Sequence, residues 1–538
     1  MKSRITSSTG GAGRKGILAS MCLALVLVVA AVSSVNLALT GISLDLGTTS
    51  SQLTWIADGY TVALAALVLP FGALGDRFGR RTLLLIGTVV FGLAALCAAV
   101  AQSAGVLIGC RVVMGIGAAM IMPGTLSTIT AVFPAAKRGR AVSIWAGFAS
   151  SGAILGLLTC GFILEWATWR ATFVATAVLA AVAFAAALML TPNTCDPNET
   201  VIDMPGYLLS GIGIGALIFA IIDGAEAGWT ATTAITGLVV AATALVSFVC
   251  WELRTPTPML DVRLFRLRGF STGTLGLTVQ FLCLFGFFLV GLQFLLLMLG
   301  YSPLHSAVCL LPLGMVVMPM SRVAPHLVEK FGQRAVMSTG LACLAAGLGL
   351  LSLLDGDSSY WHFLAGLIVV GFGMAFTSTP ATTAIVTSLP RAKQGVGSAV
   401  NDLSREFGSA LGIAILGSLY NAGYRNSISG ATVGLPPEAA HHVEESAGAG
   451  LAVAARMGPS GQQLADRTRD AFAAGLGDAL TAGALIALLA AGFTLWRAPR
   501  RNALVTAQHD ELDELDELLV DELRAIAAST HIPEAMMT

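Results

Sequence analysis

Charged side chains that could do chemistry lie inside long apolar stretches of this 538-residue chain, among them Asp58, Arg111, Asp402, Arg405 and Glu406. A charge within a lipid bilayer costs several kcal/mol, so such a residue is by default a candidate functional residue. An acid in this setting can lose its charge by taking up a proton, which changes the relative stability of two conformations. The residue types therefore indicate chemistry that links protons or cations to a change of shape.

Three of these charges share one helical face. Asp402, Arg405 and Glu406 are spaced i, i+3 and i+4, so Arg405 can pair with either acid. One interpretation is a proton-linked or cation-binding cluster that lines a pathway. The other is a buried ion pair that holds helices together. The spacing leaves both open.

Membrane-spanning helices must position these residues. The chain is 55% hydrophobic and 11% charged, with a mean hydropathy of +0.80, whereas soluble proteins carry about 25% charged residues. A helix needs roughly 20 apolar residues to cross a bilayer, and only helical backbone satisfies its own hydrogen bonds in such a segment. The sequence predicts fourteen of these helices, near 17–39, 53–74, 82–101, 105–130, 141–164, 171–190, 205–223, 232–251, 270–298, 304–323, 335–354, 361–386, 396–420 and 473–496.

Lysine and arginine are concentrated in alternate connections between these helices. If the N-terminus is cytoplasmic, most of the 30 Lys and Arg residues face the cytoplasm, which is the usual bias of membrane proteins. An even number of helices then places both termini there. The predicted segments outside the membrane are a cytoplasmic N-terminus over 1–16, an outer loop over 421–472 and an acidic cytoplasmic tail over 497–538.

The chain contains an internal repeat. The sequence GDRFGRR of Gly75–Arg81 returns as VEKFGQR over Val328–Arg334, and Pro134–Gly139 returns in the same way at Pro390–Gly395. Corresponding loops lie on the same predicted side. The repeat is therefore parallel, with its axis along the membrane normal.

This repeat predicts the fold. We expect an all-α membrane protein built from two six-helix bundles related by a parallel pseudo-repeat, with two further helices inserted between them. The bundles cover 17–190 and 270–496, and the inserted helices cover 205–251. Duplicated bundles of this size usually move solutes.

The buried charges do not follow the repeat. Arg111 aligns with Leu367, and the three charged residues near 405 align with Ala146, Ala149 and Ser150. For Arg111 this asymmetry favours a functional group over a folding device shared by both halves. The cluster near 405 is likewise an addition to the repeat, and both of its interpretations stay open.

The loop Gly75–Arg81 resembles the loop signature of the major facilitator superfamily. Further segments narrow the resemblance to its fourteen-helix drug:proton antiporters, and it covers about residues 17–496. These segments are Trp55–Tyr60, Trp169–Arg170, Pro258–Phe265, Leu299–Leu304 and Asn401–Glu406.

The resemblance implies a function and residue roles. It implies the major facilitator fold and efflux of hydrophobic, cationic drugs or antibiotics across the bacterial cytoplasmic membrane, driven by the proton gradient without a cofactor. It assigns proton coupling to Asp58 and Arg111, with Asp402, Arg405 and Glu406 as further candidates. A structural role for Arg111, capping backbone carbonyls, is the alternative. The resemblance also implies a contact, or latch, that holds the two halves together and is formed by Gly75, Asp76, Arg77, Gly79 and Arg80. In this latch Asp76 pairs with an Arg or with the positive end of a helix.

Other positions are candidates for packing and for substrate contact. Gly152, Gly156 and Gly161 give a smooth helix face that allows close packing. Phe281, Phe285, Phe288 and Gln293 are candidates for the substrate cavity. The chain departs from the family pattern at four positions, which leaves proton stoichiometry and transport direction open: Ala31, Met114, Leu157 and Cys160.

Several other functions are disfavoured. No nucleotide loop of the form Gly-x4-Gly-Lys-Ser/Thr occurs, no nucleophile and base pair indicates an enzyme, and we expect neither a metal site nor nucleic-acid binding. Two alternatives to drug efflux remain. One is export of a self-made metabolite or proton-coupled import of a nutrient. The other is a non-transporting sensor or scaffold, with tail 502–538 docking a cytoplasmic partner.

Overall fold

The computed structural model describes residues 11–193, 203–256, 258–356, 358–389, 394–431 and 436–499. The first six long helices are α1 (Gly11–Leu46), α2 (Ser50–Phe78), α3 (Arg80–Ala99), α4 (Ala104–Val132), α5 (Ala135–Trp166) and α6 (Trp169–Leu190). The next two, α7 (Met204–Ala227) and α8 (Thr232–Glu252), form a hairpin. The acidic tail over 502–538, with its predicted docking role, lies outside the described residues.

The remaining helices form the second half. They are η1 (Val262–Arg266), α9 (Arg268–Gln293) with its π-helical extension η2 (Phe294–Met298), α10 (Pro303–Cys309), α11 (Leu311–Phe331), α12 (Gln333–Leu351), α13 (Tyr360–Thr387), α14 (Gln394–Ile428), η4 (Ser429–Ala431), α15 (Pro437–Glu445), α16 (Ala447–Arg456), η5 (Gly458–Gly461) and α17 (Gln462–Arg497). All regular elements among the described residues are helical.

Thirteen segments of the described chain are long and apolar enough to cross a membrane. They correspond to thirteen of the fourteen predicted helices, with α10 and α11 together forming one segment. The remaining predicted helix is α14, which has 35 residues and is therefore about 50 Å long. It is less apolar than the others because it carries Asn401, Asp402, Arg405 and Glu406.

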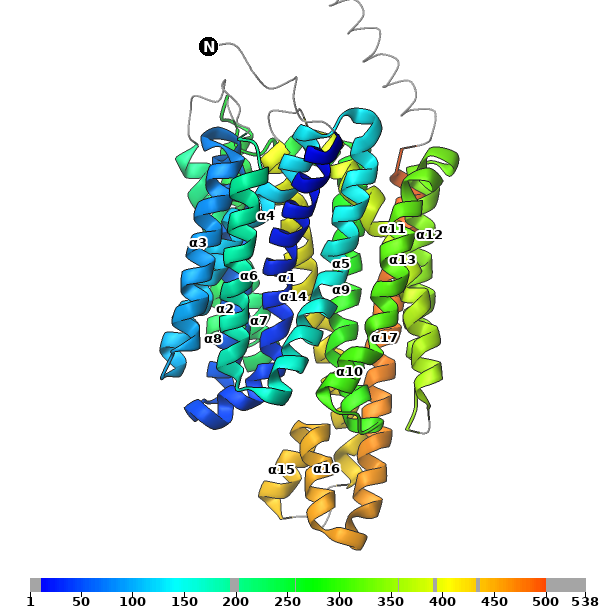
Figure 1. The fold of residues 1–538 in the computed structure, drawn as a ribbon. Coiled ribbons are helices and arrows are strands. Elements are labelled where there is room, and N and C mark those ends of the chain that lie inside the picture. Colours follow the sequence, from blue (N-terminus) through cyan, green and yellow to red (C-terminus); the bar gives the residue numbers. More distant parts are fainter. Residues whose placement is uncertain are drawn as a thin grey trace, which may run out of the picture.

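The internal repeat is visible in the packing of the helices (Figure 1). In the first half α1 packs on α5, α2 on α4, and α3 on α6; in the second half α9 packs on α14, α11 on α13, and α12 on α17. The contacts between the halves are related in the same way, because α2 packs on α14 and α5 packs on α11. The halves therefore meet along equivalent helices.

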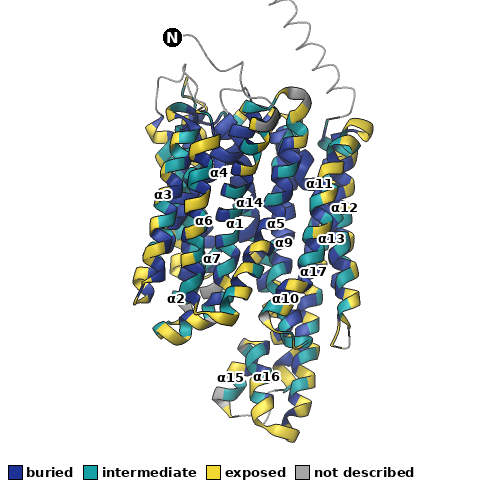
Figure 2. Cartoon of the chain, in the orientation of Figure 1, coloured by how far each residue is buried: buried dark blue, intermediate teal, exposed yellow. Residues whose placement is uncertain are grey.

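The surface of the bundle is apolar. Bulky side chains such as Leu93, Val178, Val246 and Leu489 are more than half exposed on α3, α6, α8 and α17. Figure 2 shows this exposure along the outer helices and burial along the central ones. Because water does not favour such a surface, these faces are the ones that contact lipid, and the protein is a multi-pass membrane protein.

The segment predicted as an outer loop over 421–472 is largely helical. α14 continues to Ile428, α17 begins at Gln462, and α15 and α16 lie between them. These two short helices extend beyond the bundle at the end opposite to Gly11 (Figure 1). Tyr424 Oη donates a hydrogen bond to the carbonyl oxygen of Val443 at 2.7 Å, which ties α15 to α14. The sequence did not predict these two helices, because each is short and neither is strongly apolar.

The end of the bundle near α15 and α16 is held by the Trp169–Arg170 pair. The Arg170 guanidinium forms an ion pair with Asp45, and Trp169 Nε1 donates to the same carboxylate at 3.0 Å. Arg170 also donates to the carbonyl of Ala101 at 3.1 Å. Hydrogen bonds from Arg170 and Trp169 keep the pKa of Asp45 below its ordinary value. The pair thus joins the ends of α1 and α6 to the turn after α3.

The three predicted packing glycines lie on α5, and two of them face α1. A Cβ atom on Gly156 would lie 2.5 Å from the carbonyl oxygen of Ala30, and one on Gly152 would lie 3.1 Å from Val29. Gly161 has more space, because its nearest neighbour, Leu304, would be 3.4 Å away. The close approach of α1 and α5 therefore depends mainly on Gly156.

We predict that Gly156→Ala lowers the melting temperature of the detergent-solubilised protein. The backbone of α1 would have to move, and overpacking of this kind costs about 1–3 kcal/mol. Gly109→Ala is the matched control, because a Cβ on Gly109 of α4 would meet nothing within 4 Å. Alanine is there the better helix former by about 1 kcal/mol. Equal melting temperatures for the two variants would contradict the packing role of Gly156.

Candidate functional site

A buried contact joins the two halves at the end of the bundle where α1 begins, opposite to α15 and α16. Asp76, at the end of α2, is 0% exposed. Its carboxylate accepts hydrogen bonds from the backbone N–H of Gly395 at 2.7 Å and of Val396 at 3.2 Å, in the first turn of α14. The free N–H groups and the dipole of a helix N-terminus favour a negative charge at this place. Asp76 therefore binds the first turn of a helix from the other half.

Arg80 balances the charge of this carboxylate. Its Nε and Nη2 atoms donate to Asp76 Oδ1 at 2.9 and 2.6 Å, and its Nη1 donates to the carbonyl of Ser127 at 3.3 Å. Gly79 between them has φ +103°, a conformation that favours glycine. Its N–H donates to the carbonyl of Gly75, and Arg77 lies over the ring of Phe78 at 5.2 Å. All five predicted latch residues thus lie in one turn, and Asp76 and Arg80 form its buried centre.

A cavity of about 440 Å³ lies between the halves, toward the α15–α16 end. We call it the main cavity. Apolar side chains such as Val32, Phe285 and Leu289 line it together with hydroxyl and amide groups, and Asp58 is the one charged residue in its lining. Helices α1 and α2 of the first half and α9 and α14 of the second contribute to the walls. Asp58 lies two turns after the start of α2, and its carboxyl group is part of the wall of this cavity.

The inserted hairpin also reaches the main cavity. Ile222 of α7 lies in the lining, and α7 packs on both α2 and α14. Gly211 and Gly215 allow this packing, since Cβ atoms there would lie 3.3 and 3.0 Å from Ala66 of α2. Sequence reasoning did not predict Ile222. The spacing of the two glycines was the available signal, because small residues one helical turn apart mark a close helix contact.

Arg111 is fully buried and binds backbone carbonyls. Its Nε donates to Ile56 at 2.8 Å, its Nη2 to Ala57 at 3.1 Å and its Nη1 to Ala31 at 3.2 Å. Its guanidinium lies 4.6 Å from the centre of the Tyr60 ring. This is the geometry expected of the structural alternative. It also places a positive charge close enough to Asp58 for an electrostatic interaction.

The predicted cluster on α14 is divided in space. Asp402 is 0% exposed, and its Oδ1 lies 3.8 Å from Arg405 Nη1. Arg405 reaches across to the other half, where its Nη2 donates to the carbonyl of Ala149 on α5 at 3.0 Å. Its guanidinium lies 4.6 Å from the ring centre of Phe281 and 5.6 Å from that of Trp145. The ion pair is therefore also a contact between halves.

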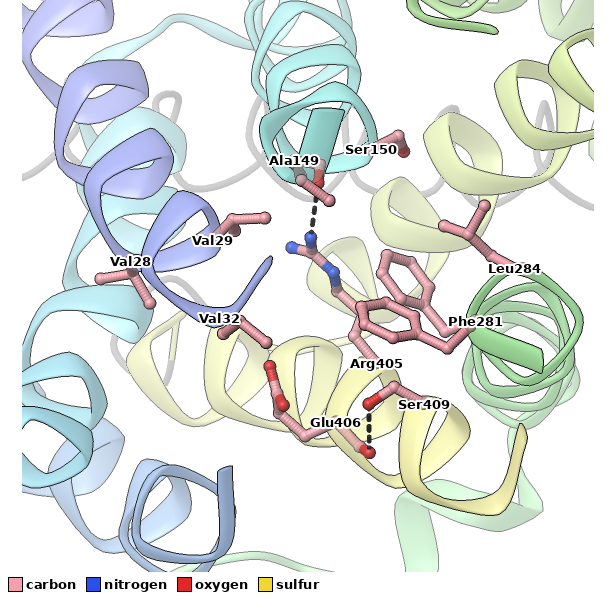
Figure 3. A pocket seen from close by; sticks show the side chains of 12 residues that line it. Val28, Val29, Val32, Ala149, Ser150, Phe281, Leu284, Arg405, Glu406 and Ser409 are labelled. Atoms are coloured by element: carbon pink, nitrogen blue, oxygen red, sulfur yellow. Dashed lines mark hydrogen bonds between the residues drawn. The ribbon is translucent and has the colours of Figure 1, made fainter. Parts of the chain in front are cut away.

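Glu406 has a different setting from Asp402. It lines a second cavity of about 20 Å³, which we call the small cavity, together with Arg405 and residues of α1, α5 and α9 (Figure 3). Val32, Phe285 and Ser409 line both cavities. Glu406 thus lies close to the main cavity, whereas Asp402 is in neither lining.

The four candidate cavity residues of α9 differ in position. Phe281 lines the small cavity and Phe285 lines both. Phe288 and Gln293 are not in either lining, and Phe288 packs against Phe285 and Phe287. A helix presents only some of its side chains to one cavity, and the phenylalanine-rich sequence did not reveal which ones.

Residues that depart from the family pattern lie in the packed interior. Arg111 binds the backbone carbonyl of Ala31, where the family's usual acid would fall. Cys160 Sγ donates to the carbonyl of Ser34 at 3.0 Å, and Leu157 and Met114 are buried. The main cavity therefore has its acid on α2 and none at position 31 of α1.

Comparison with known proteins agrees with this architecture. The chain matches the model of the Major Facilitator Superfamily over residues 21–206 and 197–413. It is 33% identical to multidrug efflux pump LfrA of Mycolicibacterium smegmatis, over 90% of this chain and 97% of that protein. It is 32% identical to methyl viologen resistance protein SmvA of Salmonella typhimurium, over 86% of this chain and 94% of that one.

Solved structures show the same fold at low sequence identity. The human organic anion transporter MFSD10 (TETRAN) superposes with a TM-score of 0.60 at 14% identity, covering 90% of this chain and 99% of that structure. The proton:xylose symporter XylE gives a TM-score of 0.59 at 14% identity, covering 91% of this chain and 97% of that structure. Sequence and fold together place this chain in the Major Facilitator Superfamily.

Proposed function

We propose that this protein expels hydrophobic, cationic drugs or antibiotics across the cytoplasmic membrane in exchange for protons, by alternating access. Relatives named as multidrug efflux and resistance proteins support the activity. Superfamily members are transporters, which argues against an enzyme. The observation that carries the proposal is the main cavity, a chamber between the halves with apolar, hydroxyl and amide side chains and a single carboxylate in its described lining.

The walls of the main cavity fit the proposed substrates. A cation with apolar groups would bury those groups against Val32, Phe285 and Leu289, where the hydrophobic effect favours it. Asp58 would attract the positive charge, and the low dielectric of the site would strengthen that attraction. A proton on Asp58 would remove the attraction, so substrate and proton would compete for one side chain.

The proposed cycle follows from the positions of the contacts. We place the N-terminal end of the bundle in the cytoplasm of a bacterial cell. In that orientation the Asp76 contact closes the cytoplasmic side, while the main cavity lies toward the outside. The reverse state requires the first turn of α14 to leave Asp76. A proton gradient supplies the energy in this scheme, and no cofactor takes part.

Ethidium accumulation tests the proposed function. Cells that express the protein should hold several-fold less ethidium than cells with an empty vector, and an uncoupler should abolish the difference. Inverted vesicles should take up the dye when the pH inside the vesicles is made lower than the pH outside. Dye flux that ignores a pH gradient of either sign would contradict proton coupling, and uptake only in right-side-out vesicles would indicate import.

We predict that Glu406→Gln flattens the pH dependence of efflux. Glutamine keeps the size of the side chain but cannot take up or release a proton. The rate of ethidium efflux from vesicles should then change less than about twofold across the pH range in which wild-type efflux changes most. Glu406→Asp keeps a titratable group and should retain a pH dependence. If Glu406→Gln lowers only the melting temperature, its role is structural.

A further inference from the structure

The small cavity is large enough for a single water molecule. Its volume is about 20 Å³, and a cavity needs roughly 10–15 Å³ of such volume to hold one water molecule. It is too small for any drug. The question is whether its walls offer the two or more polar partners that a buried water requires.

Arg405 offers two hydrogen-bond donors. Its side chain is only 4% exposed, and its Nη2 is used by the carbonyl of Ala149. Its Nε and Nη1 atoms are buried and have no hydrogen-bond partner among the described residues. The rings of Phe281 and Trp145 hold the guanidinium in place. Buried donors of this kind are normally satisfied by protein or by ordered water.

Glu406 offers the acceptor. Figure 3 shows the Arg405 guanidinium and the Glu406 carboxylate on two sides of a space toward which Val29 and Val32 point. Among the described residues Arg405 forms its ion pair with Asp402 and not with Glu406. A polar contact over such a gap is commonly bridged by water.

We propose that the small cavity binds one water molecule, which accepts a hydrogen bond from Arg405 and donates one to Glu406. This water keeps Glu406 hydrogen-bonded while it is ionised and so allows it to alternate between carboxylate and acid during transport. The inference rests on the proposed proton-coupled efflux and extends it. It adds a site of defined size whose occupant is water.

The surroundings of Glu406 show why the water matters. The charged groups near it are Asp402 and Arg405 of its own helix, and the phenol of Tyr60 on α2 also interacts with it. Residues from α1 and α9 in the cavity wall are apolar, and α5 contributes two alanines and Ser150. Without a bridging water the carboxylate would face valine side chains, and an ionised group in such a place is costly.

The proton balance is simple. In the state with the main cavity facing outside, the Glu406 carboxylate takes a proton from a hydronium ion in that cavity and becomes the neutral acid, leaving a water molecule behind. In the opposite state the acid gives the proton to water on the cytoplasmic side. The bound water is neither consumed nor formed. Its role is to stabilise the carboxylate between the two events.

Filling the small cavity tests the proposal. Val29→Ile adds one methyl group at a position that points into the cavity. We expect ethidium efflux driven by a pH gradient to fall at least tenfold in vesicles. Ethidium counterflow, which needs no net proton movement, should stay within twofold of wild type. Val29→Ala leaves room for the water and should keep gradient-driven efflux within twofold.

A matched control lies on the same helix. Val35 of α1 is 3% exposed and lies in neither cavity lining, so Val35→Ile adds the same methyl group elsewhere in the core and should preserve both activities. Gradient-driven efflux of Val29→Ile at the wild-type rate would overturn the water site. An equal loss of efflux and counterflow would also overturn it, by showing a packing defect. Absence of gradient-driven efflux in the wild type would instead contradict the proposed function.

Discussion

Replacing Asp58 by Asn should abolish proton-driven efflux while the protein still folds and inserts. Asp58 is the charged group in the lining of the main cavity, and Asn is nearly the same size but cannot exchange a proton. Without a titratable group at this position the binding of substrate is no longer linked to a proton, so we expect ethidium efflux under a pH gradient to fall to the level of vesicles without the protein.

The control for this prediction is Asp45→Asn. Asp45 is an acid at the same end of the bundle, but it pairs with Arg170 and lies in neither cavity lining. Its replacement should leave efflux within a few-fold of wild type. Dye extrusion that is unchanged in Asp58→Asn vesicles would remove Asp58 from the mechanism.

The second large effect is expected for Asp76→Asn. This change leaves the buried Arg80 without its counter-charge and weakens the contact with the first turn of α14. Removing one partner of a buried ion pair costs about 3–5 kcal/mol. We expect a lower melting temperature, at least tenfold slower efflux and a shift toward the state that is open at the N-terminal end.

Labelling of a cysteine at the contact measures this shift. Ala399 is 0% exposed and packs against Gly72 of α2, so Ala399→Cys on a background lacking the nine native cysteines should react slowly with a polar maleimide. Adding Asp76→Asn should accelerate the reaction at least tenfold.

A double variant separates the effect of the unpaired Arg80 charge from the effect of the lost contact between the halves. Asp76→Asn with Arg80→Gln leaves no unpaired buried charge, so its melting temperature should recover toward wild type while labelling at Ala399→Cys stays fast. If labelling stays slow in the single variant, Asp76 does not hold the halves together.

The sequence was most informative where one residue type has few possible uses. The apolar stretches could hardly be anything but membrane helices, and the fold agrees with that prediction. The sequence predicted an Arg or a helix N-terminus as the partner of Asp76, and in the structure Asp76 binds both Arg80 and the first turn of α14. The identity of that helix could not be deduced, because Gly395 is brought to Asp76 only by the packing of α2 on α14.

The residues that line a cavity were the hardest to predict from the sequence. The lining of the main cavity depends on which side of a helix faces the gap, so Ile222 was missed and Phe288 was included. The two acids of α14 are four residues apart, and the sequence placed them in one cluster without deciding between a proton-linked and a structural role. The helical turn keeps the two acids within about 40° of each other, and their surroundings differ because Arg405 pairs with Asp402 and extends toward α5, while Glu406 lines the small cavity.

Helix α14 connects sites that are far apart. Its first turn binds Asp76, its middle carries Arg405 and Glu406, and near its end Tyr424 is bonded to α15. Because one continuous helix carries these three contacts, we expect a movement at one of them to affect the others. In the proposed orientation an antibody fragment that binds α15 and α16 from the outer side of the membrane should therefore slow the proposed efflux, and an inhibitor of this kind would not need to cross the cytoplasmic membrane.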